Sequence, residues 1–254
     1  MFKAVLSFVG AAGDLGRFGA RAAVEAVRPP FEAGEIVRQI FEVGTRSVPL
    51  IIVAGLALGA VVAMHSQASM SRFGAQSMVP AAVSIGMIRV LGPLVTGLLV
   101  SGRVGAGIGA QLGGMRVTRQ IDALEALAVD SFKYLVVTRV LACIIALPIL
   151  TVVMDFAGLT GGMLLEMAVS HISMTLYIHD AFSALSINDY LPTIVKTAAF
   201  GVIIGTVSCF LGYNSKGGAA GVGQASTRSV VFCSILLIVI DIILVKATLL
   251  WSAQ

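Results

Sequence analysis

The chain has 254 residues, of which 57% are apolar and only 12% are charged, and its mean hydropathy is +0.98. A soluble domain carries about 25% charged residues, so this composition excludes an ordinary water-soluble enzyme and favours an all-α integral membrane protein. The net charge of +4 does not indicate a nucleic-acid partner, because the basic residues are scattered and no basic run alternates with aromatic side chains.

Residues 1–46 are expected to form a cytoplasmic and interfacial helical segment. After a Pro–Pro break, residues 31–46 place apolar and charged side chains on opposite faces of a helix, which is typical of an amphipathic helix in the membrane interface. A cleavable signal peptide is the alternative for the N-terminus, since Lys3 precedes an apolar run at residues 4–12, but basic residues recur directly afterwards.

Residues 47–254 are predicted to form a domain with five transmembrane helices. A bilayer core about 30 Å thick requires about 20 apolar residues in a helix. Five stretches meet this requirement: 47–64, 81–100, 135–156, 194–211 and 230–250. Lys and Arg are concentrated in alternate loops, which predicts a cytoplasmic N-terminus and an external C-terminus.

Three ionisable residues fall inside these spans: Arg89, Asp155 and Asp241. A charge at mid-membrane costs about 3 kcal/mol or more unless it is paired or hydrated. The three residues could therefore surround a polar headgroup or a proton path, or they could pair with one another and hold the helices in register. Lys196 and Lys246 lie near predicted span ends, where their side chains are expected to reach the interface.

Glycines recur every four residues at the end of the second span, at Gly105, Gly109 and Gly113. Such spacing lets helix backbones approach closely, so we expect it to serve packing between spans or between protomers. The segment does not follow a strand, which excludes a dinucleotide-binding loop.

The loop between the second and third spans, MRVTRQIDALEALAVDSFKY at 115–134, is predicted to hold a short amphipathic helix at about 118–128. Thr118 is expected to cap its start, and Asp122 and Glu125 to lie away from its apolar face. That face is expected to comprise Ile121, Leu124, Leu127 and Ala128. A cytoplasmic helix held by two spans suits docking of a partner, although a helix resting on the membrane has the same pattern.

The sequence lacks the motifs of an ATP-binding site and of a metal site. The sequence has no GxxxxGK[ST] loop for binding ATP, and its three histidines and three cysteines do not have the spacing of metal ligands. We therefore expect no catalytic residue, no metal and no cofactor in this chain and do not expect it to be an enzyme, so that any energy input must come from a partner or a gradient.

Several motifs together resemble one family. In order they are RVLGP at 89–93, SGRVGAGIGAQLGGM at 101–115, TRQIDAL at 118–124, VD at 129–130 and YLVVTRVLA at 134–142. They are similar to those of the MlaE/YrbE-type permeases, and the likeness runs from about residue 31 to residue 250.

The resemblance implies a function. These permeases are homodimeric membrane subunits of ABC transporters in the bacterial inner membrane, each with an interfacial helix and five spans. Two cytoplasmic ATPase subunits, which hold the ATP and Mg²⁺, dock on the loop between spans two and three. A phospholipid occupies a cavity between protomers that opens toward a periplasmic MCE-domain protein, in a system linked to outer membrane asymmetry.

The resemblance also assigns site residues. The coupling helix would present Thr118, Arg119, Gln120, Asp122, Ala123 and Glu125 to the ATPase. The lipid cavity would be lined by Met64, His65, Gln67, Arg89 and Val90.

The sequence departs from the family at three usually acidic positions, which here are Val90, Gln111 and Arg119, and Ser131 replaces a proline. Arg89 lacks its adjacent carboxylate as a result, and the ATPase should compensate for Arg119. Two other functions are compatible with the residues: an ion-coupled secondary transporter that uses the intramembrane charges, and a membrane scaffold in which the glycines serve assembly alone.

Overall fold

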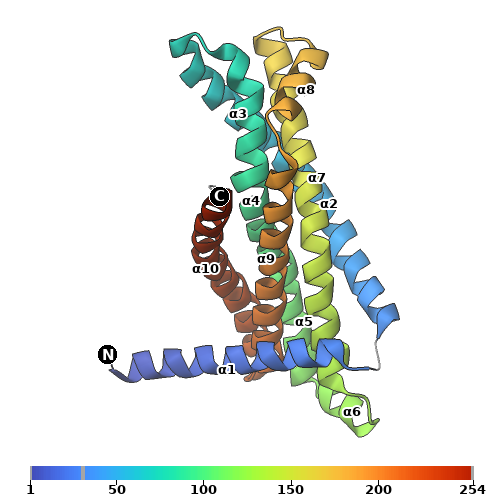
Figure 1. The fold of residues 1–254 in the computed structure, drawn as a ribbon. Coiled ribbons are helices and arrows are strands. Elements are labelled where there is room, and N and C mark those ends of the chain that lie inside the picture. Colours follow the sequence, from blue (N-terminus) through green and yellow to red (C-terminus); the bar gives the residue numbers. More distant parts are fainter. Residues whose placement is uncertain (1, 30–31, 253–254) are drawn as a thin grey trace. The chain divides into compact units, whose positions relative to one another are not determined.

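A computed structural model of the chain describes residues 2–29 and 32–252, and all regular structure in that part is helical (Figure 1). The α-helices are α1 (Phe2–Val27), α2 (Ala33–Met70), α3 (Val79–Gly86), α4 (Gly92–Val100), α5 (Ala106–Val117), α6 (Gln120–Ala126), α7 (Thr138–Val169), α8 (Met174–Ser183), α9 (Ile187–Tyr213) and α10 (Gly218–Ser252). Two 3₁₀ turns, η1 (Ser71–Phe73) and η2 (Gln76–Met78), follow α2. Three π-helical turns are η3 (Met87–Leu91), η4 (Ser101–Gly105) and η5 (Lys133–Val137).

The prediction of five transmembrane helices is confirmed. Five helical stretches are long and apolar enough to cross a membrane: Ala33–Phe73, Gln76–Val117, Lys133–Val169, Tyr190–Tyr213 and Gly218–Ala247. The second consists of α3, α4 and α5 joined through π turns without a loop. Each observed stretch is longer than its prediction, because hydropathy detects the apolar centre of a helix and misses polar turns that continue it. The cytoplasmic location of the N-terminus remains a prediction.

The helix boundaries differ from the prediction near the N-terminus. Residues 33–46, expected to form an interfacial helix that leads into the first span, form the first turns of α2, which continues unbroken to Met70. A separate helix, α1, precedes α2 and packs against η5. Phe18 of α1 stacks edge-on against Phe132 and Phe210, with ring centroids 5.0 and 5.4 Å apart.

The chain divides into two compact units, and each is built from parts of several helices. Unit 1 comprises Met1–Val43, Val100–Ala146 and Ala199–Leu237. Unit 2 comprises Gly44–Leu99, Leu147–Ala198 and Ile238–Gln254.

Small residues allow the helices of unit 1 to pack closely. A Cβ added to Gly105 would lie 3.0 Å from the Ser208 Oγ, and one added to Gly109 would lie 2.6 Å from the Ser229 Oγ. Gly113 likewise faces Ser215 at an ordinary contact distance. The regularly spaced glycines of η4 and α5 therefore face α9, α10 and their connection within one chain.

Unit 2 is held together by close approach of α2 and α7 and by a small apolar cluster. Gly59 of α2 lies directly against the backbone of Gly158 of α7, where any Cβ would overlap. The cluster consists of the buried side chains Ala63, Val79, Val83 and Met87. In the same unit α3 packs against α8, so the end of unit 2 that carries η1, η2 and α8 is a structured cap.

Candidate functional site

The loop between the second and third spans carries the short helix α6, as the sequence predicts, but its start differs from the prediction. Thr118 does not cap α6, because its Oγ1 donates to the carbonyl of Gly114 and so ends α5. The residue that begins α6 is Arg119, whose φ of 57° lies in the left-handed region. That conformation is uncommon for a residue with a side chain, and it interrupts the helix between α5 and α6.

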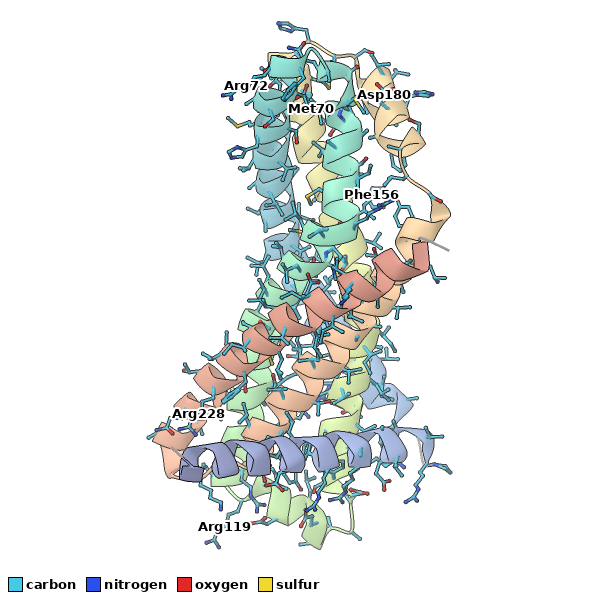
Figure 2. All side chains as sticks on the ribbon, turned by 60° about the vertical axis from the view of Figure 1, so that its left-hand side comes forward. Met70, Arg72, Arg119, Phe156, Asp180 and Arg228 are labelled. Carbon is cyan, nitrogen blue, oxygen red and sulfur yellow. The ribbon has the colours of Figure 1, made fainter. Side chains whose placement is uncertain are left out.

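The side chains of α6 are arranged differently from the predicted amphipathic pattern. Ile121 is buried, whereas Leu127 is 74% exposed and Ala128 is also exposed. The predicted apolar face is consistent with the buried Ile121 and the half-buried Leu124 but wrong for Leu127 and Ala128, because α6 ends at Ala126 and the chain turns before Leu127 can pack. Figure 2 shows Arg119 pointing outward from the loop. The outward surface of α6 is formed by Arg119, Gln120, Ala123 and Leu127.

The two acidic side chains of α6 are engaged within unit 1. Asp122 accepts a hydrogen bond from the Arg116 guanidinium at 2.8 Å. Glu125 accepts one from the Ser131 hydroxyl at 2.6 Å and a longer one from Tyr213 at 3.4 Å. Ser131 is the residue that replaces the proline of the motif, and its hydroxyl supplies a bond that proline cannot make. These contacts fix α6 on unit 1.

Gln111 also has a clear structural role. Its Oε1 accepts a hydrogen bond from the Arg139 guanidinium at 3.1 Å. Arg139 is buried, and its Nη1 donates to the Leu135 carbonyl at 2.7 Å. A neutral amide thus serves as the acceptor for Arg139 where the motif usually has a carboxylate.

The intramembrane charges pair differently from the predicted Arg–Asp arrangement. The partner of Asp241 is Lys196, whose Nζ lies 2.6 Å from the Asp241 Oδ1. Lys196 is 3% exposed, so the prediction that it reaches the interface is wrong. The sequence places Lys196 near the start of an apolar run, but α9 begins earlier and buries it. Arg89, in contrast, has an exposed side chain.

Lys196 also contacts the second span at its π turn. Pro93 has no N–H group and cannot bond to the carbonyls four or five residues before it, those of Arg89 and Ile88. The Thr193 Oγ1 donates to the Ile88 carbonyl at 3.2 Å, and the Lys196 Nζ donates to the Arg89 carbonyl at 3.4 Å. Side chains of α9 therefore satisfy the carbonyls that Pro93 leaves open.

Asp155 is a buried carboxylate in unit 2. It is 6% exposed, and within the described residues its Oδ1 has no hydrogen-bond partner. The carboxyl group presses against Gly92 at the start of α4, where a Cβ would overlap the Oδ1. Glycine at this position is thus required by the close approach of α7.

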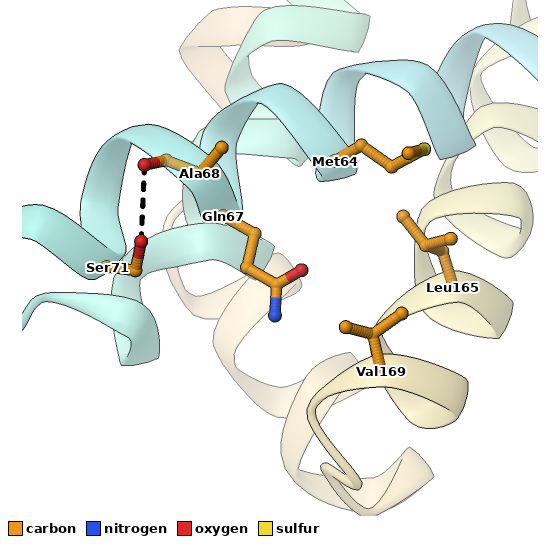
Figure 3. A pocket seen from close by; sticks show the side chains of 6 residues that line it. All are labelled: Met64, Gln67, Ala68, Ser71, Leu165 and Val169. Atoms are coloured by element: carbon orange, nitrogen blue, oxygen red, sulfur yellow. Dashed lines mark hydrogen bonds between the residues drawn. The ribbon is translucent and has the colours of Figure 1, made fainter.

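An open pocket of about 240 Å³ lies between the ends of α2 and α7 in unit 2 (Figure 3). The residues that line it are Met64, Gln67, Ala68, Ser71, Leu165 and Val169. Two of the predicted cavity residues, Met64 and Gln67, are among them, whereas His65, Arg89 and Val90 are not. Leu165 and Val169 were missed, because the sequence prediction ended the third span at residue 156 and α7 continues to Val169.

Cysteine and histidine side chains do not form a chemical site in the described part of the chain. The three cysteines are buried and unpaired with one another as disulfides. Among the described residues no three His, Cys, Asp or Glu side chains are grouped closely enough to hold a metal ion.

Comparison with known proteins gives matches along almost the whole chain. The sequence model of the family described as Permease MlaE matches residues 36–247. A probable ABC transporter permease protein of Rickettsia felis is 39% identical, and the match covers 93% of this chain and 92% of that protein. A probable ABC transporter permease protein of Synechocystis is 34% identical over 77% of this chain and 74% of its own length. The chloroplastic protein TRIGALACTOSYLDIACYLGLYCEROL 1 of Arabidopsis thaliana is 31% identical over 82% of this chain and 59% of its own length.

Proposed function

The chain belongs to the MlaE permease family, and from this premise we propose that it is the permease subunit of an ABC transporter that moves phospholipid. The transporter would work as a homodimer of this chain in the bacterial inner membrane and exchange lipid with a periplasmic MCE-domain carrier. ATP would be hydrolysed by a separate cytoplasmic subunit. The names of the bacterial relatives support the transporter class, and the motif resemblance supports the lipid substrate and the partners.

The single observation that carries this proposal is the outward surface of α6. Leu127, at the C-terminal end of α6, is a large apolar side chain that is 74% exposed. Arg119, at the N-terminal end of α6, is also exposed and has a backbone conformation that L residues rarely adopt. An exposed apolar side chain and an exposed charge on one short helix suit a protein interface, which combines apolar and polar groups. The hydrogen bonds of Asp122 and Glu125 would transmit a force on α6 to the rest of unit 1.

The proposed mechanism is a change of lipid affinity driven from α6. Closure of the ATPase pair would push on two copies of α6 and alter the cavity between protomers. A two-state change of this kind shifts the balance between conformations that bind lipid tightly and weakly. The pocket between α2 and α7, which is largely apolar with one amide, has the composition of a site for an amphiphile.

The ion pair of Lys196 and Asp241 would keep the second span in register during this change. Lys196 bonds to a carbonyl of the π turn η3 and to a carboxylate of α10, so it links two helices to α9 within unit 2. A π turn is a common location for functional side chains, and η3 contains Arg89. We assign Arg89 and Val90 to the part of the lipid path outside the α2–α7 pocket.

The test is a substitution on the outward surface of α6. Leu127→Asp places a charge at the centre of the proposed interface, so we expect the ATPase to be lost on copurification and lipid-stimulated ATP hydrolysis to fall at least about tenfold. Phe73→Asp is the matched control, because Phe73 is 85% exposed on η1 in unit 2. It should retain the ATPase. If Leu127→Asp retains full ATPase binding and stimulation, the docking assignment is wrong. Proton-dependent uptake without any ATPase would instead support the ion-coupled carrier.

A further inference from the structure

A chain of hydrogen bonds connects the α2–α7 pocket to a buried carboxylate. The Gln67 Nε2 donates to the Ser170 Oγ at 2.6 Å, and the Ser170 Oγ donates to the Glu166 Oε2 at 2.8 Å. Gln67 lies on α2, and Glu166 lies on α7 with 1% of its surface exposed. Residues about a hundred positions apart in sequence thus form one polar relay inside unit 2, which the sequence did not predict.

The direction of the relay is determined by the hydrogens available. The Glu166 Oε2 accepts a hydrogen bond from the Ser170 hydroxyl. It can do so as part of an ionised carboxylate or of an acid that is protonated on the Oε1. A serine hydroxyl has one hydrogen, so when Ser170 donates to Glu166 it can only accept from Gln67. The NH₂ group of Gln67 faces Ser170 in this arrangement.

The amide oxygen of Gln67 is consequently an acceptor held in a fixed orientation. Figure 3 shows it pointing into the space beside Leu165 and Val169, away from the nitrogen that contacts Ser170. Hydrogen bonds in a chain polarise one another, and donation from the amide nitrogen toward a carboxylate strengthens the amide oxygen as an acceptor. The six side chains that line the pocket include no charged group, so the oxygen faces an apolar surface.

The size of the pocket limits what it can hold. Pockets that enclose a drug-sized ligand measure about 300–1,000 Å³, whereas this one has about 240 Å³ and is open on one side. It can hold a small headgroup, while acyl chains would remain outside it. The group that satisfies an amide oxygen is an N–H or O–H donor, and a charged ammonium donor makes the stronger bond.

On the basis of the proposed lipid transport, we propose that Gln67 selects the lipid headgroup. Its amide oxygen favours phospholipids with an ammonium N–H donor over those with a quaternary ammonium. Ser170 and Glu166 are positioning residues that keep the oxygen directed at the ligand. The preference follows from the presence of an N–H donor and not from charge, because ethanolamine and choline headgroups carry the same positive charge.

The experiment measures lipid bound to the purified transporter complex, loaded from vesicles that contain equal amounts of two lipids. Phosphatidylethanolamine and its mono-, di- and trimethylated forms lose donors stepwise, and the dimethyl form keeps one N–H. Wild type should prefer the first three over phosphatidylcholine by about three- to tenfold, the effect of one hydrogen bond. The preference should disappear at the last methylation only.

Substitutions in and around the hydrogen-bond chain distinguish headgroup selection by Gln67 from a general effect on the structure of the pocket. Gln67→Met keeps the size of a half-buried side chain and should bring the ratio of bound ethanolamine to choline lipid to about one. Glu166→Gln retains an acceptor for Ser170 and should keep the preference, whereas Ser170→Ala breaks the relay and should weaken it. Ser71→Ala is the matched control, since Ser71 lines the pocket but bonds to the Ala68 carbonyl outside the relay. Its ratio should equal that of wild type.

The outcomes distinguish the two proposals. An unchanged preference in Gln67→Met, or no preference in wild type, would overturn the role of Gln67 and leave lipid transport intact. If wild type and every variant retain no phospholipid, the proposed function itself fails.

Discussion

Units 1 and 2 differ in the kind of polar group that they bury without a hydrogen-bond partner. In unit 1 the Arg139 guanidinium donates to Gln111 and to a backbone carbonyl, and Ser131 connects α6 to the third span. Within the described residues, unit 1 leaves the Arg139 Nε and the Ser215 Oγ without a hydrogen-bond partner, whereas unit 2 leaves carboxylate oxygens without one, namely the Asp155 Oδ1 and the Glu166 Oε1. Buried polar groups without partners destabilise a fold, and they are found mainly where function requires them. Under the proposed function, unit 1 would transmit force from α6 and unit 2 would bind the ligand.

The physical basis of the contrast is desolvation. A buried acceptor without a partner destabilises the folded protein by about 1–3 kcal/mol. A buried ionised carboxylate destabilises it further unless a cation lies close by. In unit 2 Asp241 has such a cation in Lys196, while Asp155 lies against the backbone of Gly92. The effects of substitutions should therefore differ between these two carboxylates.

The largest effect is expected for Lys196→Met, which keeps the apolar stem but leaves Asp241 buried without its cation. The free energy of unfolding should fall by about 3–5 kcal/mol, measured by thermal unfolding of the purified protein in detergent. The double variant Lys196→Met/Asp241→Leu should recover most of the loss. A single variant as stable as wild type would show that the ion pair does not hold unit 2 together.

An intermediate effect is expected for Gly109→Val in unit 1. The added atoms would meet the Ser229 hydroxyl and the backbone of α10, so the helices must separate, at a cost of about 2 kcal/mol. Gly107→Val is the matched control in the same helix, because a Cβ on Gly107 has no atom within 4 Å. Equal melting temperatures of the two variants would contradict the packing described for α5.

The smallest effect is expected for Asp155→Asn in unit 2. Asparagine keeps the shape of the side chain and removes the charge that burial disfavours, so stability should rise by up to about 1 kcal/mol. Differential scanning calorimetry of the purified protein measures the change. A fall of the same size would mean that the Asp155 carboxylate has a stabilising partner and that the contrast between the units is smaller than described.

Much of the fold could be predicted from the sequence, because hydropathy over about 20 residues directly reflects the thickness of a bilayer. The position of α6 followed from a helical pattern between two apolar runs. The residue that begins α6 could not be predicted in the same way, since the hydroxyl of Thr118 can bond at the end of one helix as well as at the start of the next. The burial of Lys196 was missed for a similar reason, because distance from the end of an apolar run does not show where the helix itself begins.

The candidate site was predictable only in part. Met64 and Gln67 were identified by resemblance, but Glu166 and Ser170 lay in a stretch assigned to an external loop. A single acidic residue within the apolar run GGMLLEMAV at 161–169 was the available signal for a buried carboxylate. Glu166 is linked to Gln67 through Ser170. This link depends on contact between α2 and α7, which are far apart in sequence, so no local sequence pattern predicts it.

The central claim is that the chain crosses the membrane five times and presents α6 to the cytoplasm. The three native cysteines are buried, so a cysteine introduced by Leu127→Cys would be the accessible thiol, with Phe73→Cys reporting on the opposite side. We predict that a membrane-impermeant maleimide labels Phe73→Cys in spheroplasts with an intact inner membrane, and labels Leu127→Cys only after that membrane is opened. Labelling of Leu127→Cys in the intact spheroplasts would contradict the account, because α6 would then be out of reach of any cytoplasmic ATPase.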